Sequence, residues 1–404
     1  MTKNTKNCTT ILLQFLATFM LYRFVTAVDD GLLVNGDFET GPGANGTSTY
    51  ATEAAGVRSL PAWSVEGMVE YIEAGQRQGN MLLVVPEGKH AVRLGNDAQI
   101  SQSLKVLKGT TYSLTFSAAR TCAQLESLNV SVPPATRDID LQTLYNIRGW
   151  DDYAWAFRAD SEDVQVVFHN PGLEDDPSCG PIIDSVAIKQ ITMPVESKDN
   201  LAVNGDFEEG PWMFPNATLG VLLPTNLDVT TSPLPGWIVE SNKAVRYIDS
   251  NHHTVPEGKR AVELLAGKEG IISQMVDTEP GKKYTMSFLL GDAGNNCQTP
   301  MAVMAFAGDQ ADNFHYSPAA IRSYEPNNVT FTAKAQRTRI AFYSIYYNTR
   351  KVDRSSLCGP VIDQVKVIDP SKSGAGAIRL LGINFFHLCL LNVFTVAVMV
   401  GLFM

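Results

Sequence analysis

The chain has 404 residues, of which 45% are hydrophobic and 18% charged, and its formal net charge is −10. This hydrophobic content is sufficient for one or more buried cores. The acidic balance argues against a nucleic-acid-binding protein, because nucleic acids require a basic surface.

The N-terminus has the pattern of a secretory signal peptide. Lys3 and Lys6 precede an apolar run, and small residues up to Ala27 follow it. We therefore expect residues 1–27 to be a signal peptide and the mature protein to be extracellular.

The C-terminus has the pattern of a lipid-attachment signal. Residues 380–404 are almost wholly apolar, and a run of small residues that includes Ser373 and Gly374 precedes them. This order is typical of a glycosylphosphatidylinositol (GPI) signal, so we expect a spacer and signal over residues 371–404 and attachment at Ser373 or Gly374. The alternative is a tail-anchored helix, although no Lys or Arg follows the apolar run.

Between these ends the sequence contains one long repeat. Each copy opens on Asn-Gly-Asp-Phe-Glu, at residues 35–39 and 204–208, and closes on Cys-Gly-Pro-Ile/Val-Ile-Asp, at 179–184 and 358–363. The period is far longer than that of a solenoid repeat, which favours two homologous domains. We expect them at residues 28–192 and 201–370, joined by a short linker at 193–200.

The local pattern predicts strands in both copies. Tyr112, Leu114 and Phe116 alternate with polar residues, as does the run 128–132, and turn residues separate these stretches. Alternation with a period of two indicates strands with one buried face. The predicted fold class is all-β, with two tandem β-sandwiches of plausible jelly-roll topology.

Four cysteines remain when Cys8 and Cys389 are assigned to the two terminal signals. Each domain holds two of them, so an oxidising compartment predicts one bridge per domain. The expected pairs are Cys122–Cys179 and Cys297–Cys358. Metal ligation by these cysteines is less economical, because no Cys-x-x-Cys cluster occurs.

Four sequons fit an extracellular glycoprotein. Two of them fall on the polar phase of alternating runs, where a glycan faces solvent. The acceptor residues are Asn45, Asn129, Asn216 and Asn328.

The sequence offers little sign of a catalytic site. No Gly-x-Ser-x-Gly elbow or His-Glu-x-x-His motif is present. Glu174, Asp175 and Asp176 form an acidic cluster that could serve a glycosidase, but a Pro- and Gly-bounded solvated loop is the preferred interpretation. We expect no enzyme activity and no catalytic residues.

Carboxylates recur at the ends of both domains. Their positions suggest a structural Ca²⁺ in each domain, because first and last strands of a sandwich often meet and Ca²⁺ prefers oxygen ligands. The alternative is that they form turn and capping hydrogen bonds. The four residues are Glu39, Asp184, Glu208 and Asp363.

Aromatic side chains provide candidates for sugar stacking. Trp150 and Tyr153 lie in a loop-like segment and are the preferred surface candidates, while Tyr343 belongs to an aromatic group in the second domain. Trp63 and Trp237, which occupy matching positions, are expected in the two cores.

In combination, the repeated opening and closing strings described above resemble those of the BIIDXI-like family of plant cell-wall proteins, a family with a domain of unknown function. These strings are residues 35–39, 179–184, 204–208 and 358–363. The resemblance covers nearly all of the chain between the terminal signals. It implies two galactose-binding-like domains, similar to carbohydrate-binding modules, and association with wall polysaccharide and pectin methylesterase. The hydrophobic tail is not part of the family pattern, so anchoring to the plasma membrane is an additional expectation.

The resulting hypothesis is a non-catalytic wall protein that binds pectin, cellulose or hemicellulose and modulates pectin methylesterase. A secreted glycan hydrolase or esterase is the first alternative, in which Glu174 or Asp175 would be required. A GPI-anchored co-receptor in cell-surface signalling is the second.

Overall fold

The computed structural model describes residues 31–371 with internal gaps. The residues outside the described part are 1–30, 43–58, 79–80, 123–125, 142–144, 146, 173–175, 177–178, 196, 198, 216–218, 241–242, 317–323 and 372–404. The expected signal peptide and lipid-attachment signal therefore lie outside the described residues. Among the residues that are described, no helix has the length and apolar character needed to cross a membrane.

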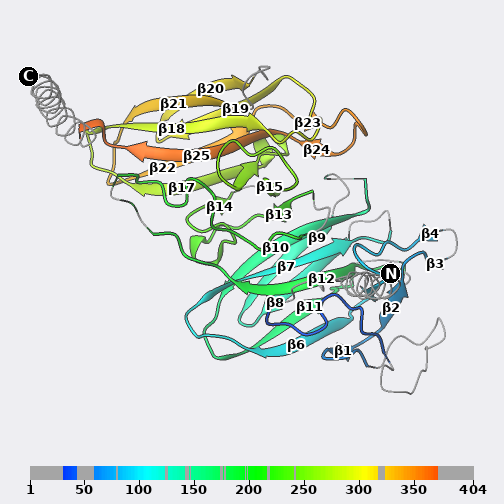
Figure 1. Ribbon diagram of the computed structural model, residues 1–404. Coiled ribbons are helices and arrows are strands. Elements are labelled where there is room, and N and C mark those ends of the chain that lie inside the picture. The colour runs from blue at the N-terminus through cyan, green and yellow to red at the C-terminus, as the bar shows by residue number, and fades with distance from the viewer. Residues whose placement is uncertain are drawn as a thin grey trace, which may run out of the picture.

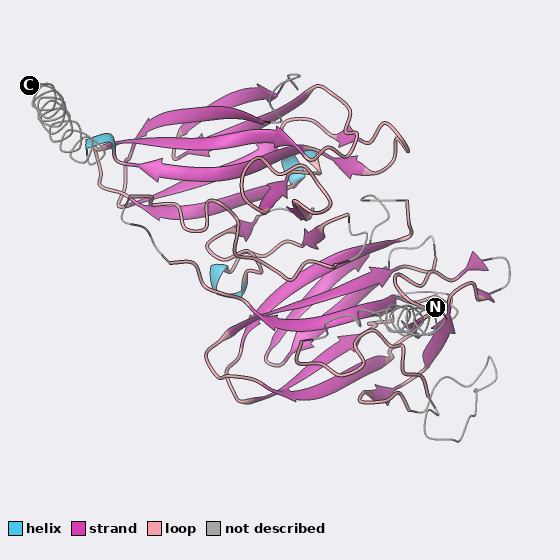
Figure 2. Ribbon diagram, viewed as in Figure 1, coloured by secondary structure: helices cyan, strands magenta, loops and turns pink. Residues whose placement is uncertain are grey.

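The first half of the chain folds into two facing sheets (Figures 1 and 2). One sheet has the order β1 (Ser64–Glu66), β6 (Gln99–Lys105), β11 (Asp163–His169), β8 (Glu126–Val132), β9 (Ala135–Leu141). The other has the order β2 (Val69–Glu73), β5 (His90–Leu94), β12 (Ile182–Gln190), β7 (Thr111–Ala119), β10 (Trp150–Arg158). A small hairpin pairs β3 (Arg77–Gln78) with β4 (Met81–Leu82).

The second half repeats this architecture. Its first sheet has the order β14 (Ile238–Val239), β17 (Ile271–Asp277), β22 (Arg337–Ser344), β19 (Met301–Ala307), β20 (Gln310–Tyr316). Its second has the order β15 (Val245–Asp249), β16 (Arg260–Glu263), β25 (Pro360–Ile368), β18 (Lys283–Asp292), β21 (Tyr324–Thr332). Shorter elements are β23 (Asn348–Thr349), β24 (Leu357–Cys358) and the 3-10 turns η1 (Val229–Thr231) and η2 (Gly267–Glu269). The predicted all-β class with two sandwiches is confirmed.

One strand joins the two halves. β13 (Val221–Leu223) pairs in parallel with β10 of the first domain and antiparallel with β15 of the second. The result is a single eleven-stranded sheet that runs through both domains, with β2 at one end and β21 at the other. Figure 1 shows β13 and β15 between the two sandwiches. The two domains therefore share backbone hydrogen bonds as well as a linker.

The cores follow from the alternation seen in the sequence. Tyr112, Leu114 and Phe116 of β7 all point into the first sandwich and are at most 3% exposed. Leu222 and Leu265 of the second domain belong to the same buried cluster. Apolar packing thus continues across the domain boundary, which the sequence did not predict.

Both expected disulfides are present. Cys122 and Cys179 have a Cα–Cα distance of 5.6 Å, and Cys297 and Cys358 one of 5.7 Å. Each bridge ties the segment before the last strand of its domain to the segment after β7 or β18. A cross-link that spans about 60 residues restricts the unfolded chain and would contribute roughly 4 kcal/mol in the chain-entropy model.

Candidate functional site

The repeated opening string, residues 35–39 and 204–208, forms a tight turn in each domain, which we call the hook. In the first, Asn35 has a φ of 56°, a conformation that Asn tolerates better than most residues. Its side-chain Nδ2 donates to the carbonyls of Thr40 (3.0 Å) and Pro61 (3.2 Å), and its Oδ1 accepts from the Thr40 amide (2.9 Å). One buried amide side chain therefore fixes the turn and ties it to the neighbouring loop.

Aromatic residues hold the hook against the core. The Trp63 indole donates to the Asn35 carbonyl at 3.0 Å, and the Tyr71 hydroxyl donates to the Phe38 carbonyl at 2.7 Å. The rings of Phe38 and Trp63 are 5.5 Å apart. The expectation that Trp63 is a core residue is correct, since it is 5% exposed.

The second domain repeats each of these contacts. Asn204 has a φ of 49° and bonds to the backbone of Glu209 and Pro235. The Trp237 indole donates to the Asn204 carbonyl at 3.1 Å, and the Tyr247 hydroxyl donates to the Phe207 carbonyl at 2.7 Å. The shared string is thus required by the fold, whatever ligand each domain binds.

The glutamate that ends the hook binds a second loop. Glu39 Oε1 accepts hydrogen bonds from the amides of Lys89 (2.5 Å) and His90 (3.0 Å). A Cβ on Gly88 would lie 2.2 Å from this oxygen, and the φ of Gly88 is 68°, so glycine is required there. In the second domain Glu208 Oε1 accepts from Lys259 (2.6 Å) and Arg260 (3.2 Å).

The late aspartates bind the same loops from the other side. Asp184 Oδ2 accepts from the Glu87 amide at 3.0 Å, and Asp363 Oδ2 accepts from the Glu257 amide at 2.9 Å. First and last segments of each domain therefore meet at one loop, as expected. The observed contacts are the turn and capping hydrogen bonds of the alternative interpretation.

The electrostatics of these aspartates are unusual. Burial, together with the nearby Glu208 and Glu257 carboxylates, raises the pKa of Asp363 to about 8 against the opposing effect of its backbone hydrogen bonds. Burial likewise raises the pKa of Asp184 well above its usual range, with Glu87 and Glu39 acting in the same direction. Like charges gathered in a buried site are what a hard divalent cation would compensate.

The donor types fit Ca²⁺, but the side chains alone do not complete a site. Among the described residues, the one group of at least three His, Cys, Asp or Glu donors within metal-ligand distance is Cys122, Glu126 and Cys179. Two of these are joined in a disulfide. A cation at either hook would therefore need backbone carbonyls beside Glu39 and Asp184, or beside Glu208 and Asp363.

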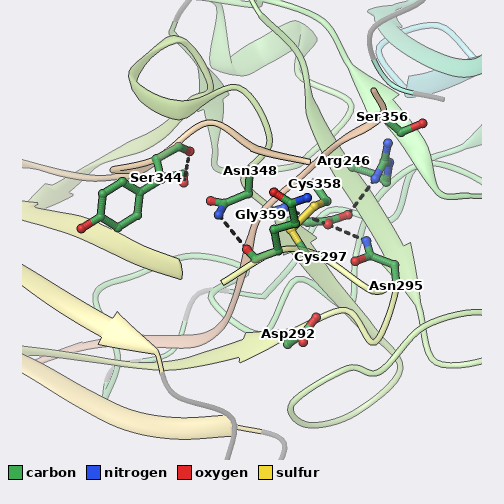
Figure 3. The surroundings of a disulfide bond; sticks show 12 residues. Arg246, Asp292, Asn295, Cys297, Ser344, Asn348, Ser356, Cys358 and Gly359 are labelled. Carbon is green, nitrogen blue, oxygen red and sulfur yellow. Dashed lines mark hydrogen bonds and ion pairs between the residues drawn. A yellow bond between two sulfur atoms is a disulfide. The ribbon is translucent and has the colours of Figure 1, made fainter. Parts of the chain in front are cut away.

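A buried ion pair distinguishes the second domain. Arg246 Nη1 lies 2.9 Å from Glu263 Oε2, and the two side chains are 1% and 0% exposed. Burial alone would raise the pKa of Glu263, but the Arg246 charge and hydrogen bonds from Asn295 and the Gly359 amide hold it below its usual value. Figure 3 shows these partners around the Cys297–Cys358 bridge.

The first domain has the same pair with its charges exchanged. Glu70 faces Arg93 across β2 and β5, as Arg246 faces Glu263 across β15 and β16. Glu70 and Arg93 form a salt bridge in which Glu70 is 23% exposed. The pair in the first domain is therefore partly exposed, whereas the equivalent pair in the second domain is fully buried where that domain meets the first.

Of the two preferred sugar-stacking residues, one is excluded. Tyr153 is 2% exposed and stacks on Phe116 inside the core, so the prediction for this residue was wrong. Its position in β10, rather than in a loop, is the physical reason. Trp150 is half-buried at the start of β10, with the Arg148 guanidinium 5.7 Å from its ring centre.

The remaining predicted sites divide between described and undescribed residues. Asn328 is exposed, and Asn129 is partly exposed with its Nδ2 bonded to Asp138 (2.7 Å) and Thr136 (3.0 Å). The others lie outside the described residues: Asn45, Asn216, Glu174, Asp175, Ser373 and Gly374.

Sequence reasoning missed one surface. The outer face of the β14-β17-β22-β19-β20 sheet carries Met304 and Phe306, which are partly exposed between the buried Val303 and Ala305. The whole run 301–307 is apolar, so the usual polar–apolar alternation gave no signal.

A family model described as "Protein of unknown function (DUF642)" matches this chain twice, over residues 31–189 and 200–368. The chain belongs to the DUF642 family. Among its relatives, Protein DUF642 L-galactono-1,4-lactone-responsive gene 2 of Arabidopsis thaliana is 51% identical over 360 residues, which cover 89% of this chain and 97% of the relative. Protein TEEBE, also of Arabidopsis thaliana, is 46% identical over 338 residues, covering 84% and 91%.

Solved structures show weaker likenesses to this DUF642 protein. The TmCBM61 module in complex with beta-1,4-galactotriose has a TM-score of 0.25 and 16% identity, covering 39% of this chain and 97% of the module. The ANX1 ectodomain from Arabidopsis thaliana has a TM-score of 0.25 and 9% identity, covering 75% and 88%. The fold assignment rests on the strands and sheets themselves.

Proposed function

We propose that this protein is a non-catalytic extracellular protein that binds plant cell-wall polysaccharide. Its membership of a plant family, its two disulfides and its paired β-sandwiches support this assignment. The observation that carries the proposal is the outer face of the β14-β17-β22-β19-β20 sheet in the second domain.

This face presents a continuous apolar strip. Tyr343 of β22 is flanked by Ile271 of β17 and Met304 of β19, its register partners on the adjacent strands. The Phe306 ring lies 5.5 Å from the Tyr343 ring. Neighbouring strands lie about 4.8 Å apart, so these side chains form a flat surface against which sugar rings can stack.

The same face of the first domain is polar. Phe168 and Phe342 hold equivalent places against Trp63 and Trp237, which fixes the correspondence between β11 and β22. His169 then corresponds to Tyr343. Its register partners Gln99 and Asn129 replace Ile271 and Met304, and Ser131 replaces Phe306. The apolar strip is therefore specific to the second domain and is not required by the sandwich.

The test exchanges the residues of one face for those of the other. The triple variant Met304→Gln, Phe306→Ser, Tyr343→His, which uses Gln at 304 so that no Asn-Ala-Ser sequon arises, should bind roughly tenfold or more weakly, because each aromatic contact contributes about 0.5–1.5 kcal/mol. Binding is measured as depletion of the secreted chain by insoluble pectin, xylan and cellulose. His169→Ala with Gln99→Ala is the matched control on the first domain, leaves its sequon intact and should bind normally.

Two results would refute the proposal. The wild-type chain could fail to bind any of the three polysaccharides, or the triple variant could bind as tightly as wild type while retaining its thermal stability. Release of reducing ends or methanol during the incubation would instead favour the hydrolase or esterase alternative.

Three finer features belong to the same proposal: modulation of pectin methylesterase, a GPI anchor and a structural Ca²⁺ in each domain. We infer modulation of pectin methylesterase and a GPI anchor at Ser373 or Gly374 from the family resemblance and the tail pattern. Enzyme assays with and without the purified chain test the first, and release from membranes by a phospholipase specific for GPI anchors tests the second. Failure of either leaves polysaccharide binding in place.

We also propose a structural Ca²⁺ at each hook, bound by Glu39 with Asp184 and by Glu208 with Asp363. The gathered carboxylates and raised aspartate pKa values support it. Ca²⁺ should raise the melting temperature of the chelated protein, and Glu208→Gln should reduce that increase. A melting temperature that Ca²⁺ leaves unchanged would exclude the site.

A further inference from the structure

Two equivalent strands, β10 and β21, differ in whether another part of the chain covers them. β10 pairs with β7 in the first domain, and β21 pairs with β18 in the second. The strings Tyr112–Phe116 and Tyr284–Phe288 align, so Thr115 corresponds to Ser287. Their register partners are Ala154 and Asn328, which therefore occupy the same place in the two sandwiches.

The second domain covers β10. β13 lies along its edge, with Asp152 paired to Val221 and Tyr153 to Leu222. Ala154 is 0% exposed and belongs to a buried cluster with Met213 and Phe214 of the second domain. Both the edge of this strand and its outward face are thus protected.

β21 ends the eleven-stranded sheet, and within the described residues no strand lies beyond it. It is nine residues long, and its outward-facing side chains are exposed at Pro326, Asn328, Thr330 and Thr332. An exposed edge of this length is a template for pairing with another chain.

An N-glycosylation sequon lies on the outward face of β21. Asn328-Val329-Thr330 fits the acceptor pattern, and Val329 is buried while Asn328 points away from the core. An N-linked glycan is bulky and solubilising. At Asn328 it would fill the space that, over Ala154, is taken by the second domain.

We propose that a glycan on Asn328 takes the place of a following domain and prevents a second copy of this chain from adding to β21. The first domain of that copy is the fitting partner, because its β2 edge corresponds to the β15 edge that lies next to β13. Such a contact is head-to-tail and leaves another β21 free, so it can repeat from copy to copy. The glycan therefore keeps the chain monomeric.

The experiment compares secreted, full-length mature chains that differ at the sequon. Asn328→Gln removes the glycan and should form assemblies whose mass increases with concentration in light scattering and sedimentation velocity. Thr330→Ser keeps an acceptor sequence and should stay monomeric and glycosylated. Intact-mass measurement reports whether Asn328 carries a glycan in each chain.

Two further variants separate an edge contact from a general loss of solubility. Asn129→Gln removes the sequon on the first domain's outer face and should remain monomeric. Adding Thr330→Lys to Asn328→Gln places a charge on the outward face of β21 and should restore the monomer.

Four outcomes would overturn the proposal. They are an unmodified Asn328 in a monomeric wild-type chain, a monomeric Asn328→Gln variant, assembly of Asn129→Gln to the same extent, and no effect of the added lysine. All are independent of polysaccharide binding, so they leave the proposed function unaffected.

Discussion

The two domains share a skeleton and differ at the surfaces that each presents to its surroundings. Their hooks agree contact by contact, from Asn35 and Asn204 to Trp63 and Trp237. Their outer faces differ, since His169 and Asn129 stand where the second domain has Tyr343 and Met304. Duplication thus preserved the interactions that close the sandwich and left the exposed strands free to diverge.

The largest difference should appear at the charge-exchanged ion pairs. Glu263→Gln leaves Arg246 buried without its counter-ion and should cost about 3–5 kcal/mol. Glu70→Gln, the counterpart in the first domain, removes a carboxylate that is 23% exposed and leaves the buried Arg93 bonded to Gln78, so it should cost less, about 1–2 kcal/mol. Urea unfolding of both variants measures the two losses of unfolding free energy, which are then compared. Equal costs would show that domain contact has not changed the character of this pair.

The hooks should behave alike, in contrast to the ion pairs. Asn35→Ala and Asn204→Ala each remove three hydrogen bonds and place alanine at positive φ, so each should destabilise its domain by about 2–4 kcal/mol. Asn→Gly at either position relieves the backbone strain and should recover part of the loss. A cost confined to one domain would break the equivalence of the hooks.

The domain boundary itself offers a smaller effect. The Tyr145 hydroxyl accepts a hydrogen bond from the Ala244 amide at 3.1 Å, and Tyr145 is 3% exposed. Tyr145→Phe leaves that amide unpaired and should cost about 1–3 kcal/mol. Hydrogen exchange should show faster opening at residues 244–245, with no change in the β1-β6-β11-β8-β9 sheet. Uniform loss of protection would argue against a boundary role.

The smallest effect, when it is measured over a single pH unit, is the gradual pH dependence of stability. Because the folded pKa of Asp363 is about 8, above its unfolded value, the folded chain binds more protons than the unfolded chain between roughly pH 4 and 8. In chelator, stability should therefore fall as pH rises through this window, by at most about 1.4 kcal/mol per pH unit for this group. Asp363→Asn should flatten the profile, and an unchanged slope would show that Asp363 does not titrate there.

Much of the fold could be predicted because its determinants are local. Alternation at Tyr112–Phe116 correctly predicts a strand, although its polar residues Ser113 and Thr115 are buried as well, and two cysteines per domain allow one pairing within each. The joining of the sheets could not be predicted, because β13 has three residues and pairs in parallel with a strand more than sixty residues earlier. Such a short apolar run carries no information about its partner.

The candidate sites were predicted less evenly. The spacing of Glu39 and Asp184 correctly brought the two chain ends to one loop, because first and last strands meet in this architecture. Tyr153 was misplaced since Gly149 and two aspartates suggested a loop, whereas β10 begins at Trp150. Tyr343 was among the aromatic candidates, but its neighbours Met304 and Phe306 were not predicted, because a strand that is apolar on both faces gives no periodic signal.

The eleven-stranded sheet makes the tandem the smallest piece of this chain that can fold with its surfaces covered. A chain cut in the linker would leave Ala154 bare on one fragment and Leu222 bare on the other. Either half, expressed alone, would therefore expose apolar surface that the other half normally buries. Because β13 pairs with strands of both halves, each half depends on the other to cover an edge of its sheet.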